Sequence, residues 1–418
     1  MTNMENNTGT GRRGLFQSPD GKNLLAVFAL VTTLFLLWGF CNGLIDVLNK
    51  HFQSTLHINK FQSGFVQTAN YMAYFFMAIP AGLLAKRFGY KGGILIGLTL
   101  IVTGALWFVA ATQFATYGAF LAGLFILATG MTCLETVANP YTTVLGPAEK
   151  SAARINIAQT FNGVGWILGP VVGGTFIFEG AKQANHNSGL LVPYLGIAVV
   201  VAVLLVIFSV SRLPDLTPQE TEGEIASDDK RSLIARPRFT LGVLAQFLYV
   251  AAQTGIFAFF INYVIENQHV TELVAKDWLG YFGFGLFMVG RLCGSAVVSF
   301  FKAHQALSLY AAINVVLCGL AMLGGNLGYA AVLGTFFFMS IMFPTIFALS
   351  IRGLGEHTKL GSSLIVMSIV GGAIVPPLMG HIADISSMRV GFLVPAACFV
   401  LIAVYGVWWP KLDRRGSH

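Results

Sequence analysis

Long apolar runs separated by short charged segments constrain this fold more than any other feature of the sequence. A run of about 20 apolar residues crosses the hydrocarbon core of a bilayer as a helix. Twelve such runs occur, at 24–48, 62–85, 92–112, 116–146, 154–178, 190–212, 239–265, 277–300, 304–325, 328–351, 361–383 and 389–409. In lipid every backbone polar group needs an internal partner, so each run should be helical. The sequence predicts an all-α membrane protein with twelve transmembrane helices.

Composition supports lipid as the solvent. Charged residues make up 10% of the 418 residues, against roughly 25% in soluble domains, and hydrophobic residues make up 55%. A membrane β-barrel would instead show alternating segments of roughly 10 residues. The net charge of +7 follows the segments between the runs, so it does not indicate nucleic acid. The five cysteines lie inside apolar runs without metal or disulfide spacing, which favours a packing role.

One polar interval divides the twelve runs six and six. It includes PDLTPQETEGEIASDDKRS, which is too polar to bury. We therefore expect five parts: a cytoplasmic N-terminal tail, a six-helix bundle, a cytoplasmic linker, a second six-helix bundle and a C-terminal tail. Their expected bounds are 1–23, 24–212, 213–238, 239–409 and 410–418.

The distribution of basic residues predicts the orientation. If the N-terminus is cytoplasmic, nineteen of the 25 Lys and Arg residues fall on the cytoplasmic side and five outside, while Arg291 lies within a run. Loops on the cytoplasmic side of a membrane carry an excess of Lys and Arg. Both termini are therefore expected in the cytoplasm.

Prolines at matching places indicate that the two halves repeat each other. Pro140 and Pro344 are 204 positions apart, in the fourth and tenth runs, and Pro170 and Pro376 are 206 apart, in the fifth and eleventh. Parallel repeats place a substrate site near the bilayer midplane, between halves that rock against each other. Pro140 and Pro344 are expected to have structural roles, with a bend at Pro140.

The first run ends with a polar face. Trp38, Asn42, Asp46 and Asn49 follow helical spacing and share one side of the helix. Asp46 is either an interfacial carboxylate near the helix end or an ion-attracting group in a water-filled cavity. The aligned amides favour the second interpretation.

The fourth run carries a second polar face, formed by Thr132, Glu135, Thr136 and Asn139. A carboxylate at the centre of a membrane helix costs perhaps 2–3 kcal/mol unless it is paired, hydrated or protonated. Glu135 should therefore face the protein interior. It is either a structural acid bonded to a neighbouring helix or a group that exchanges a coupling proton.

The fifth run adds amides and an aromatic ring on one face, at Gln159, Asn162 and Trp166. Amides both donate and accept hydrogen bonds, which suits the hydroxyls of a neutral sugar. The alternative is that such amides join helices to one another. Their occurrence on three helices favours a binding site.

The second half offers fewer polar candidates. Tyr249 and Gln253 in the seventh run are possible substrate contacts, and Arg291 is the only cation in the interior of a run. We interpret Arg291 as a structural lock near the cytoplasmic end rather than a ligand-binding group. The sequence has no phosphate loop, nucleotide fingerprint or nucleophile elbow, so an enzymatic or ATP-driven function and a cofactor are not expected.

Several motifs resemble those of one transporter family. LWGFCNGLIDVLNKHFQ, CLETVANPYTTVLGP, NIAQTFNGVGW, AQFLYVAAQT and GSSLIVMSIVGGAIVPPLMG resemble the fucose:proton symporter family of the major facilitator superfamily, and the likeness extends from 24 to 409. The resemblance implies two six-helix bundles with pseudo-two-fold symmetry. One departure from the superfamily is Lys86 in GLLAKRFGYKGG, where an Asp is usual.

The resemblance also implies a function: cation-coupled import of a neutral monosaccharide, most notably L-fucose, by rocker-switch alternating access. Asp46 and Glu135 would serve cation coupling and sugar recognition, and Gln159 and Asn162 the sugar site; Trp38 and Asn42 are further substrate candidates. Such a protein would work, as a monomer, in the lipid bilayer of a bacterial inner membrane.

The coupling ion stays open between proton and sodium. Asp46 with Asn42, or Glu135 with Thr132 and Asn139, offers oxygens that could bind sodium. Alternative functions are symport of glucose, galactose or N-acetylglucosamine, drug/proton antiport, a sugar uniporter and a sensor. The amides argue against the antiporter, the two acids against the uniporter, and the lack of a signalling domain against the sensor.

Overall fold

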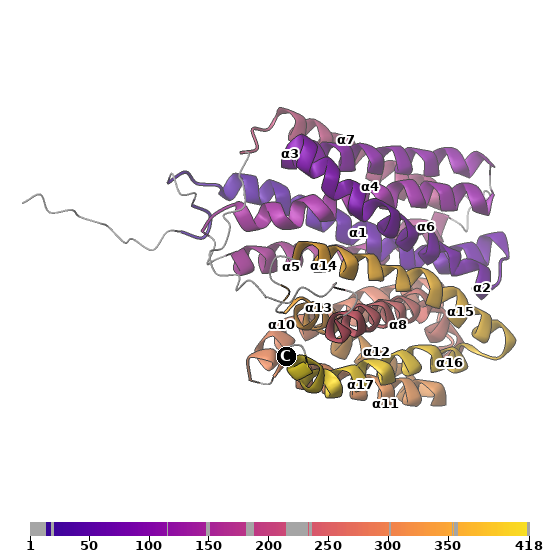
Figure 1. Cartoon of the computed structure of the whole chain (residues 1–418). Coiled ribbons are helices and arrows are strands. Elements are labelled where there is room, and N and C mark those ends of the chain that lie inside the picture. The colour runs from indigo at the N-terminus through magenta and orange to yellow at the C-terminus, as the bar shows by residue number, and fades with distance from the viewer. Residues whose placement is uncertain are drawn as a thin grey trace, which may run out of the picture.

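The structure is a computed structural model of long helices that run side by side (Figure 1). It describes residues 14–17, 21–114, 116–147, 151–180, 188–214, 233, 236–300, 302–352, 354 and 358–415. Ten described helices are long and apolar enough to cross a membrane. They account for eleven of the twelve passes, because one of them contains two passes, and the twelfth pass is described below.

The first half of the chain makes six passes. Its elements are α1 (Leu25–Leu56), α2 (Lys60–Ser63), α3 (Phe65–Phe114), α4 (Tyr117–Val144), α5 (Ser151–Leu168), η2 (Gly169–Gly173), α6 (Gly174–Gly180) and α7 (Ser188–Val210). Here α5, the π-helical segment η2 and α6 form one pass. The predicted end of the first span, at 48, is wrong by eight residues. The polar stretch after it stays helical because its side chains contact the second half.

α3 contains two of the predicted passes. Residues 60–114 would measure about 80 Å as a straight helix, far more than the roughly 30 Å of hydrocarbon. The backbone leaves the helical conformation at Gly89, with φ 71° and ψ 179°, where a glycine is favoured. The hydroxyl of Tyr117, just past α3, donates to the carbonyl of Gln62, just before it, at 2.7 Å. The chain therefore reverses direction within α3.

The second half also makes six passes. Its elements are α8 (Pro237–Gln268), α9 (Glu272–Trp278), η4 (Leu279–Phe284), α10 (Gly285–Phe300), α11 (Ala303–Leu323), α12 (Gly325–Met339), α13 (Met342–Ile351), α14 (Thr358–Met367), η6 (Ser368–Val370), α15 (Gly371–Ile385), α16 (Met388–Gly391) and α17 (Leu393–Arg415). The combination α9–η4–α10 is the pass that completes the predicted twelve.

The first helices of the two halves are alike. α1 and α8 both have 32 residues and both end at a histidine in the left-handed conformation, His57 and His269. The matched prolines sit differently. α4 runs without a break through Pro140, whereas the chain breaks between α12 and α13, just before Pro344. The repeat is therefore one of helical plan rather than of local detail.

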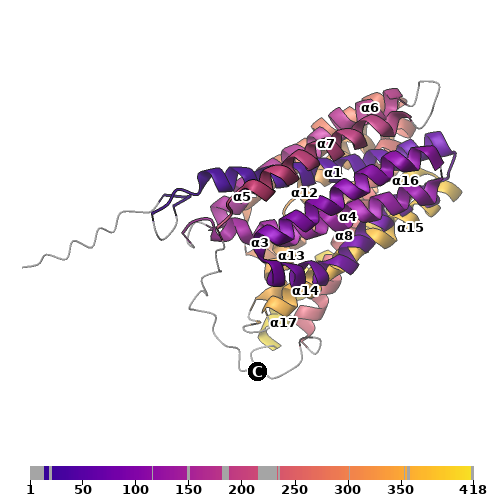
Figure 2. The same ribbon diagram turned by 90° about the horizontal axis from the view of Figure 1, so that it is seen from above.

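The two halves pack against each other along their length. The first half, indigo to magenta, lies above the second half, rose-red to yellow, in Figure 1. The start of α1 and the end of α17 lie at one end of the molecule, which we call the termini end. α2, α6 and α16 lie at the opposite end, the far end, and Figure 2 agrees for α6 and α16. α9 lies there too, because its Glu272 pairs with Lys50 near the end of α1. Most of the predicted linker, 213–238, is outside the described residues, so the bounds of the five predicted parts stay predictions.

Candidate functional site

Glycines bring the polar faces of α1 and α5 together. A Cβ atom on Gly39 would lie 2.1 Å from the Asn162 carbonyl oxygen, and one on Gly165 would lie 2.3 Å from that of Leu36. Such contacts leave no room for a side chain. In lipid, small residues let helix backbones approach closely, and packing at that distance drives association. The predicted faces of the first and fifth runs are therefore held next to each other.

Asp46 is buried on α1, at the boundary between the halves. Its exposed fraction is 3%, and its Oδ1 accepts a hydrogen bond of 2.7 Å from Nε2 of Gln67 on α3. Its Oδ2 is buried and has no hydrogen-bond partner among the residues that the structure describes. A buried carboxylate oxygen without a partner is costly. Asp46 thus has one oxygen held by the protein and one oxygen able to accept a proton or a cation.

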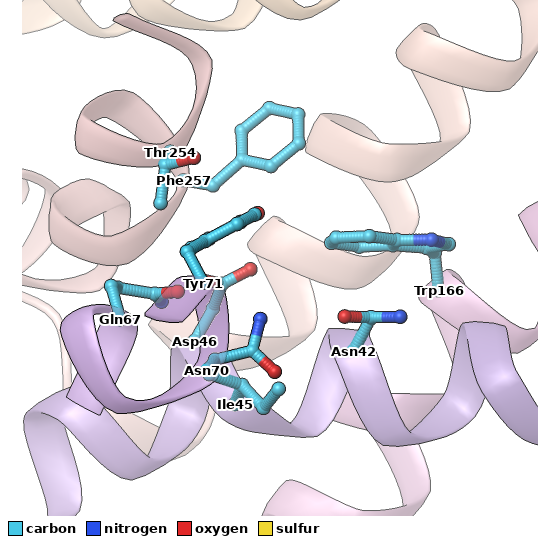
Figure 3. Close-up of a pocket in the computed structure, with 9 residues that line it drawn as sticks. All are labelled: Asn42, Ile45, Asp46, Gln67, Asn70, Tyr71, Trp166, Thr254 and Phe257. Carbon is cyan, nitrogen blue, oxygen red and sulfur yellow. Dashed lines mark hydrogen bonds between the residues drawn. The ribbon is translucent and has the colours of Figure 1, made fainter. Parts of the chain in front are cut away.

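A small cavity adjoins Asp46. Its volume is about 10 Å³, and Figure 3 shows its lining, which includes Asn42, Trp166 and, from the second half, Thr254 and Phe257. This space is at the lower limit for one water molecule. A monosaccharide would need the halves to separate here.

Glu135 is half-buried on α4 and bonded to α3. It accepts a hydrogen bond from the hydroxyl of Tyr74, and the Tyr74 oxygen accepts one of 3.1 Å from Nε1 of Trp38. The Tyr74 hydroxyl also has a side-chain hydrogen bond with Asn42, whose Nδ2 donates to the Trp38 carbonyl at 3.1 Å. Three of the predicted residues, Trp38, Asn42 and Glu135, therefore meet around one tyrosine.

The remaining candidates of the first half make separate contacts. Nε2 of Gln159 donates to Oδ1 of Asn139 at 3.3 Å, and Nδ2 of Asn162 donates to the Phe35 carbonyl at 3.2 Å. The hydroxyl of Thr132 donates to the Ala128 carbonyl of its own helix. Asn162 keeps its amide oxygen for other partners, and Gln159 is half-buried.

The second half presents mainly aromatic rings. Phe257 lies edge-on to Trp166 and stacks on Phe336, with ring centroids 5.9 and 4.6 Å apart. Tyr249 is fully buried, and its hydroxyl donates to the Met339 carbonyl at 2.9 Å, so that group is occupied within the second half. Gln253 is half-buried and is not part of the cavity lining. The predicted substrate roles of Tyr249 and Gln253 stay predictions.

Arg291 lies against an aromatic ring of its own helix. Its guanidinium carbon is 5.2 Å from the centroid of Phe287, one turn earlier in α10. A cation over an aromatic face is attracted by the ring quadrupole. This contact accords with a structural role, which remains a prediction.

Polar contacts join the two halves at the far end. Gln53 and Asn262 exchange two amide hydrogen bonds, of 2.6 and 3.3 Å, and Nδ2 of Asn49 donates to the Ala258 carbonyl at 3.0 Å. The hydroxyl of Thr68 donates to the Ala373 carbonyl at 2.6 Å. Asn49, which belongs to the predicted face of the first run, thus contacts the opposite half.

Charged groups reinforce this closure. Lys60 pairs with Glu266 at 2.7 Å, and Lys50 pairs with Glu272 at 3.5 Å. The Asp384 carboxylate accepts hydrogen bonds from the first two backbone N–H groups of α2. We call these amide and charged contacts together the far-end closure; they join Asn49, Lys50, Gln53 and the start of α2 to Ala258, Asn262, Glu266, Glu272 and Asp384. Sequence reasoning missed it because it paired no residues across the two halves.

The second run carries a further polar face that intramembrane charge alone does not reveal. Gln67, Asn70, Tyr71 and Tyr74 follow the helical spacing i, i+3, i+4 and i+7 in the second run. They form the α3 polar face, which contacts both acids. None of the four is charged, so they were not among the predicted site residues, which were found mainly by looking for acids and amides near them.

The fold and the site define the class of protein: a multi-pass membrane protein of twelve passes in two related bundles, with a buried acid, Asp46, where the bundles meet. Residues 27–368 match the model of the Major Facilitator Superfamily. The chain belongs to this superfamily.

Two curated relatives match most of the chain. The L-fucose-proton symporter of Escherichia coli is 38% identical over 92% of this chain and 93% of that protein. The glucose/galactose transporter of Brucella abortus is 36% identical over 94% of this chain and 96% of that protein. The predicted resemblance to fucose:proton symporters is confirmed.

Solved structures support the fold. The crystal structure of the Major Facilitator Superfamily transporter FucP, in the outward conformation, is 38% identical and superposes with a TM-score of 0.67, covering 92% of this chain and 98% of that chain. The predicted major facilitator fold is confirmed.

Proposed function

We propose that this protein imports a neutral monosaccharide, most notably L-fucose, together with a cation. Two acids, the buried Asp46 where the halves meet and the half-buried Glu135 on α4, lie among amides and aromatic rings, and this observation carries the proposal. Neutral sugar hydroxyls suit amides, and a coupling cation requires an acid. The names of the two relatives support a sugar as substrate.

Each acid has a part in this proposal. The unpartnered Oδ2 of Asp46 takes the coupling cation, and Glu135 makes sugar binding depend on that cation. Gln159 and Asn162 hold sugar hydroxyls. The cation is a proton or a sodium ion; the oxygens of Asp46 and Asn42 beside the same cavity fit either. No cofactor takes part.

The transport cycle follows from the closed far end. Both termini lie on the cytoplasmic side of a bacterial inner membrane, so the far end faces outward. The cavity beside Asp46, of about 10 Å³, is too small for a sugar. The halves of a monomer must separate at the far end to admit substrate. They then rock to release it at the termini end.

Uptake by proteoliposomes tests this function. Labelled L-fucose is offered with a proton gradient or a sodium gradient, each imposed alone, and unlabelled glucose, galactose and N-acetylglucosamine serve as competitors. We expect accumulation above the external concentration under one gradient and competition by the preferred sugar. Strong competition by glucose or galactose would assign the alternative substrate.

The second candidate function, drug/proton antiport, is tested alongside. Its cavity would need to accept large apolar compounds, and the phenylalanines around Phe257 are the observation in its favour. An antiporter would give protection from toxic compounds and no sugar accumulation. Absence of accumulation under both gradients would reject the sugar proposal.

A further inference from the structure

The α3 polar face touches both acids and the opposite half. Gln67 donates to Asp46 at 2.7 Å, and Tyr74, two turns later, donates to Glu135. Between them, the Tyr71 hydroxyl has a side-chain hydrogen bond with the hydroxyl of Thr254 on α8. One helix face therefore links two acids that lie on different helices, α1 and α4.

Tyr71 is confined at the boundary between the halves. A Cβ atom on Gly372 of α15 would lie 2.8 Å from the Tyr71 ring and 2.8 Å from Oγ1 of Thr254. The ring therefore fills a space that only a glycine leaves open. Separation of the halves at this level must move Tyr71 relative to Thr254 and break their hydrogen bond. The same helix carries the groups that bond to the acids.

The contact of Gln67 with Asp46 and the contact of Tyr74 with Glu135 have different effects on the two acids. Gln67 occupies Oδ1 of Asp46, so a cation or proton is directed to the unpartnered Oδ2. Tyr74 receives a hydrogen bond from Trp38 and gives its own proton to Glu135, so its hydroxyl has one direction. A hydrogen bond to a charged group is stronger than one to a neutral group. Loss of the charge on either acid therefore weakens its bond to α3.

We propose that Gln67 and Tyr74 are positioning residues for cation coupling: they transmit the state of Asp46 and Glu135, through α3 and Tyr71, to the contact between the halves. This inference rests on the proposed function, because it assigns parts of the same coupled site. It makes α3 the element that reports whether a cation is bound. Sugar contacts remain on α4 and α5.

The test separates coupling from binding. Tyr74→Phe removes one hydroxyl, and Gln67→Leu removes the amide that holds Asp46. Each variant is reconstituted and assayed for exchange of labelled sugar without a gradient, and for accumulation under the gradient that drives the wild type. We expect exchange within about threefold of wild type and accumulation reduced by about tenfold or more.

Tyr263→Phe is the matched control. Tyr263 is equally buried, and its hydroxyl donates to the Ala321 carbonyl at 2.7 Å within the second half. This control should lower exchange and accumulation together, if at all. Wild-type accumulation by both α3 variants would overturn the inference, and so would an equal loss of exchange and accumulation. A wild type that accumulates no sugar would instead reject the proposed function.

Discussion

Beside the Asp46 cavity the first half presents an acid and amides, whereas the second half presents mainly phenylalanine rings. Asp46 and Glu135 both belong to the first half, and the cavity wall opposite Asp46 is formed by Phe257 with Phe284 and Phe336 behind it. The two halves share a helical plan, so this difference lies in the side chains that each half presents to the cavity. The difference indicates that the groups for cation coupling lie in the first half, whereas the second half contributes mainly an apolar packing surface. Substitutions in the two halves should therefore fail in different ways.

The largest expected effect is loss of coupling in the first half. Glu135→Gln removes the charge but keeps the size and some hydrogen bonding with Tyr74. Gradient-driven accumulation should fall to the equilibrium level while exchange stays measurable. The readout is the steady-state ratio of internal to external sugar in proteoliposomes. Glu179→Gln, at an exposed position on α6, is the control. Full uphill uptake by the Glu135 variant would contradict the coupling role.

The next effect concerns the glycines. Gly165→Ala places a methyl group against α1, and Gly371→Ala places one 2.2 Å from the Phe247 carbonyl in the second half. Overpacking of this kind costs about 1–3 kcal/mol of unfolding free energy. Both variants should therefore melt earlier in detergent.

Only Gly165→Ala should also weaken sugar binding, because it displaces the α5 amides from α1. Thermal melts with and without sugar measure both effects. Gly196→Ala, where no atom lies within 4 Å of the added Cβ, is the control. Equal loss of sugar-induced stabilisation in both variants would show that the binding groups are not confined to the first half.

A smaller effect is expected from the aromatic wall. Phe257→Leu keeps an apolar side chain but loses edge-on and stacked ring contacts, which contribute about 0.5–1.5 kcal/mol. KM for sugar should rise about threefold to tenfold, with the accumulation ratio unchanged. Phe392→Leu, a buried ring against Tyr263, serves as the matched control. A fall in accumulation ratio with unchanged KM would assign coupling to the second half as well.

The smallest effect is expected at the far-end closure. Lys60→Glu opposes Glu266 and should favour opening, while the added Glu266→Lys should restore closure. Partly exposed ion pairs contribute about 0.2–1 kcal/mol, so the shift should be about twofold to fivefold.

Opening at the far end can be measured by chemical labelling. Thr68→Cys places a thiol beside the Ala373 carbonyl, in a background with Cys293→Ser to remove the exposed cysteine. Its reaction with a membrane-impermeant maleimide reports opening. Faster labelling after the single reversal and wild-type labelling after the double reversal are expected. Labelling that ignores both changes would remove this ion pair from the closure.

The sequence predicted the fold well because lipid imposes a simple rule. Runs of sufficient length and hydropathy must be helices, and the six-plus-six division follows from one polar interval. The first span was predicted to end at 48, but α1 continues through Lys50, Gln53 and Ser54 to Leu56. In the structure they bond to Glu272 and Asn262 of the second half. Contacts between distant segments decide such ends, and periodicity within one segment does not reveal them.

The candidate site was predicted only in part, for a related reason. The spacing of Trp38, Asn42 and Asp46 placed them on one face, and the structure puts Asn42 and Asp46 beside one cavity. Gln67 and Tyr74 were not predicted, because a neutral polar side chain in an apolar run costs much less free energy than a charged one and therefore stands out less in the sequence. Tyr249 drew attention as a polar group, yet its hydroxyl bonds to the Met339 carbonyl. Whether a polar group already has a hydrogen-bond partner depends on how the helices pack, so the sequence alone does not reveal it.

The far-end closure combines neutral and charged contacts, and these respond differently to dissolved salt. The Lys50–Glu272 and Lys60–Glu266 pairs are 19–36% exposed, so mobile ions screen them, whereas the Gln53–Asn262 amide pair is uncharged. The Debye length is about 10 Å at 0.1 M salt and shortens as salt rises. External ionic strength should therefore ease opening of the far end whichever cation is coupled. A stimulation of transport rate by sodium chloride identifies sodium as the coupling ion only when choline chloride of equal strength fails to reproduce it.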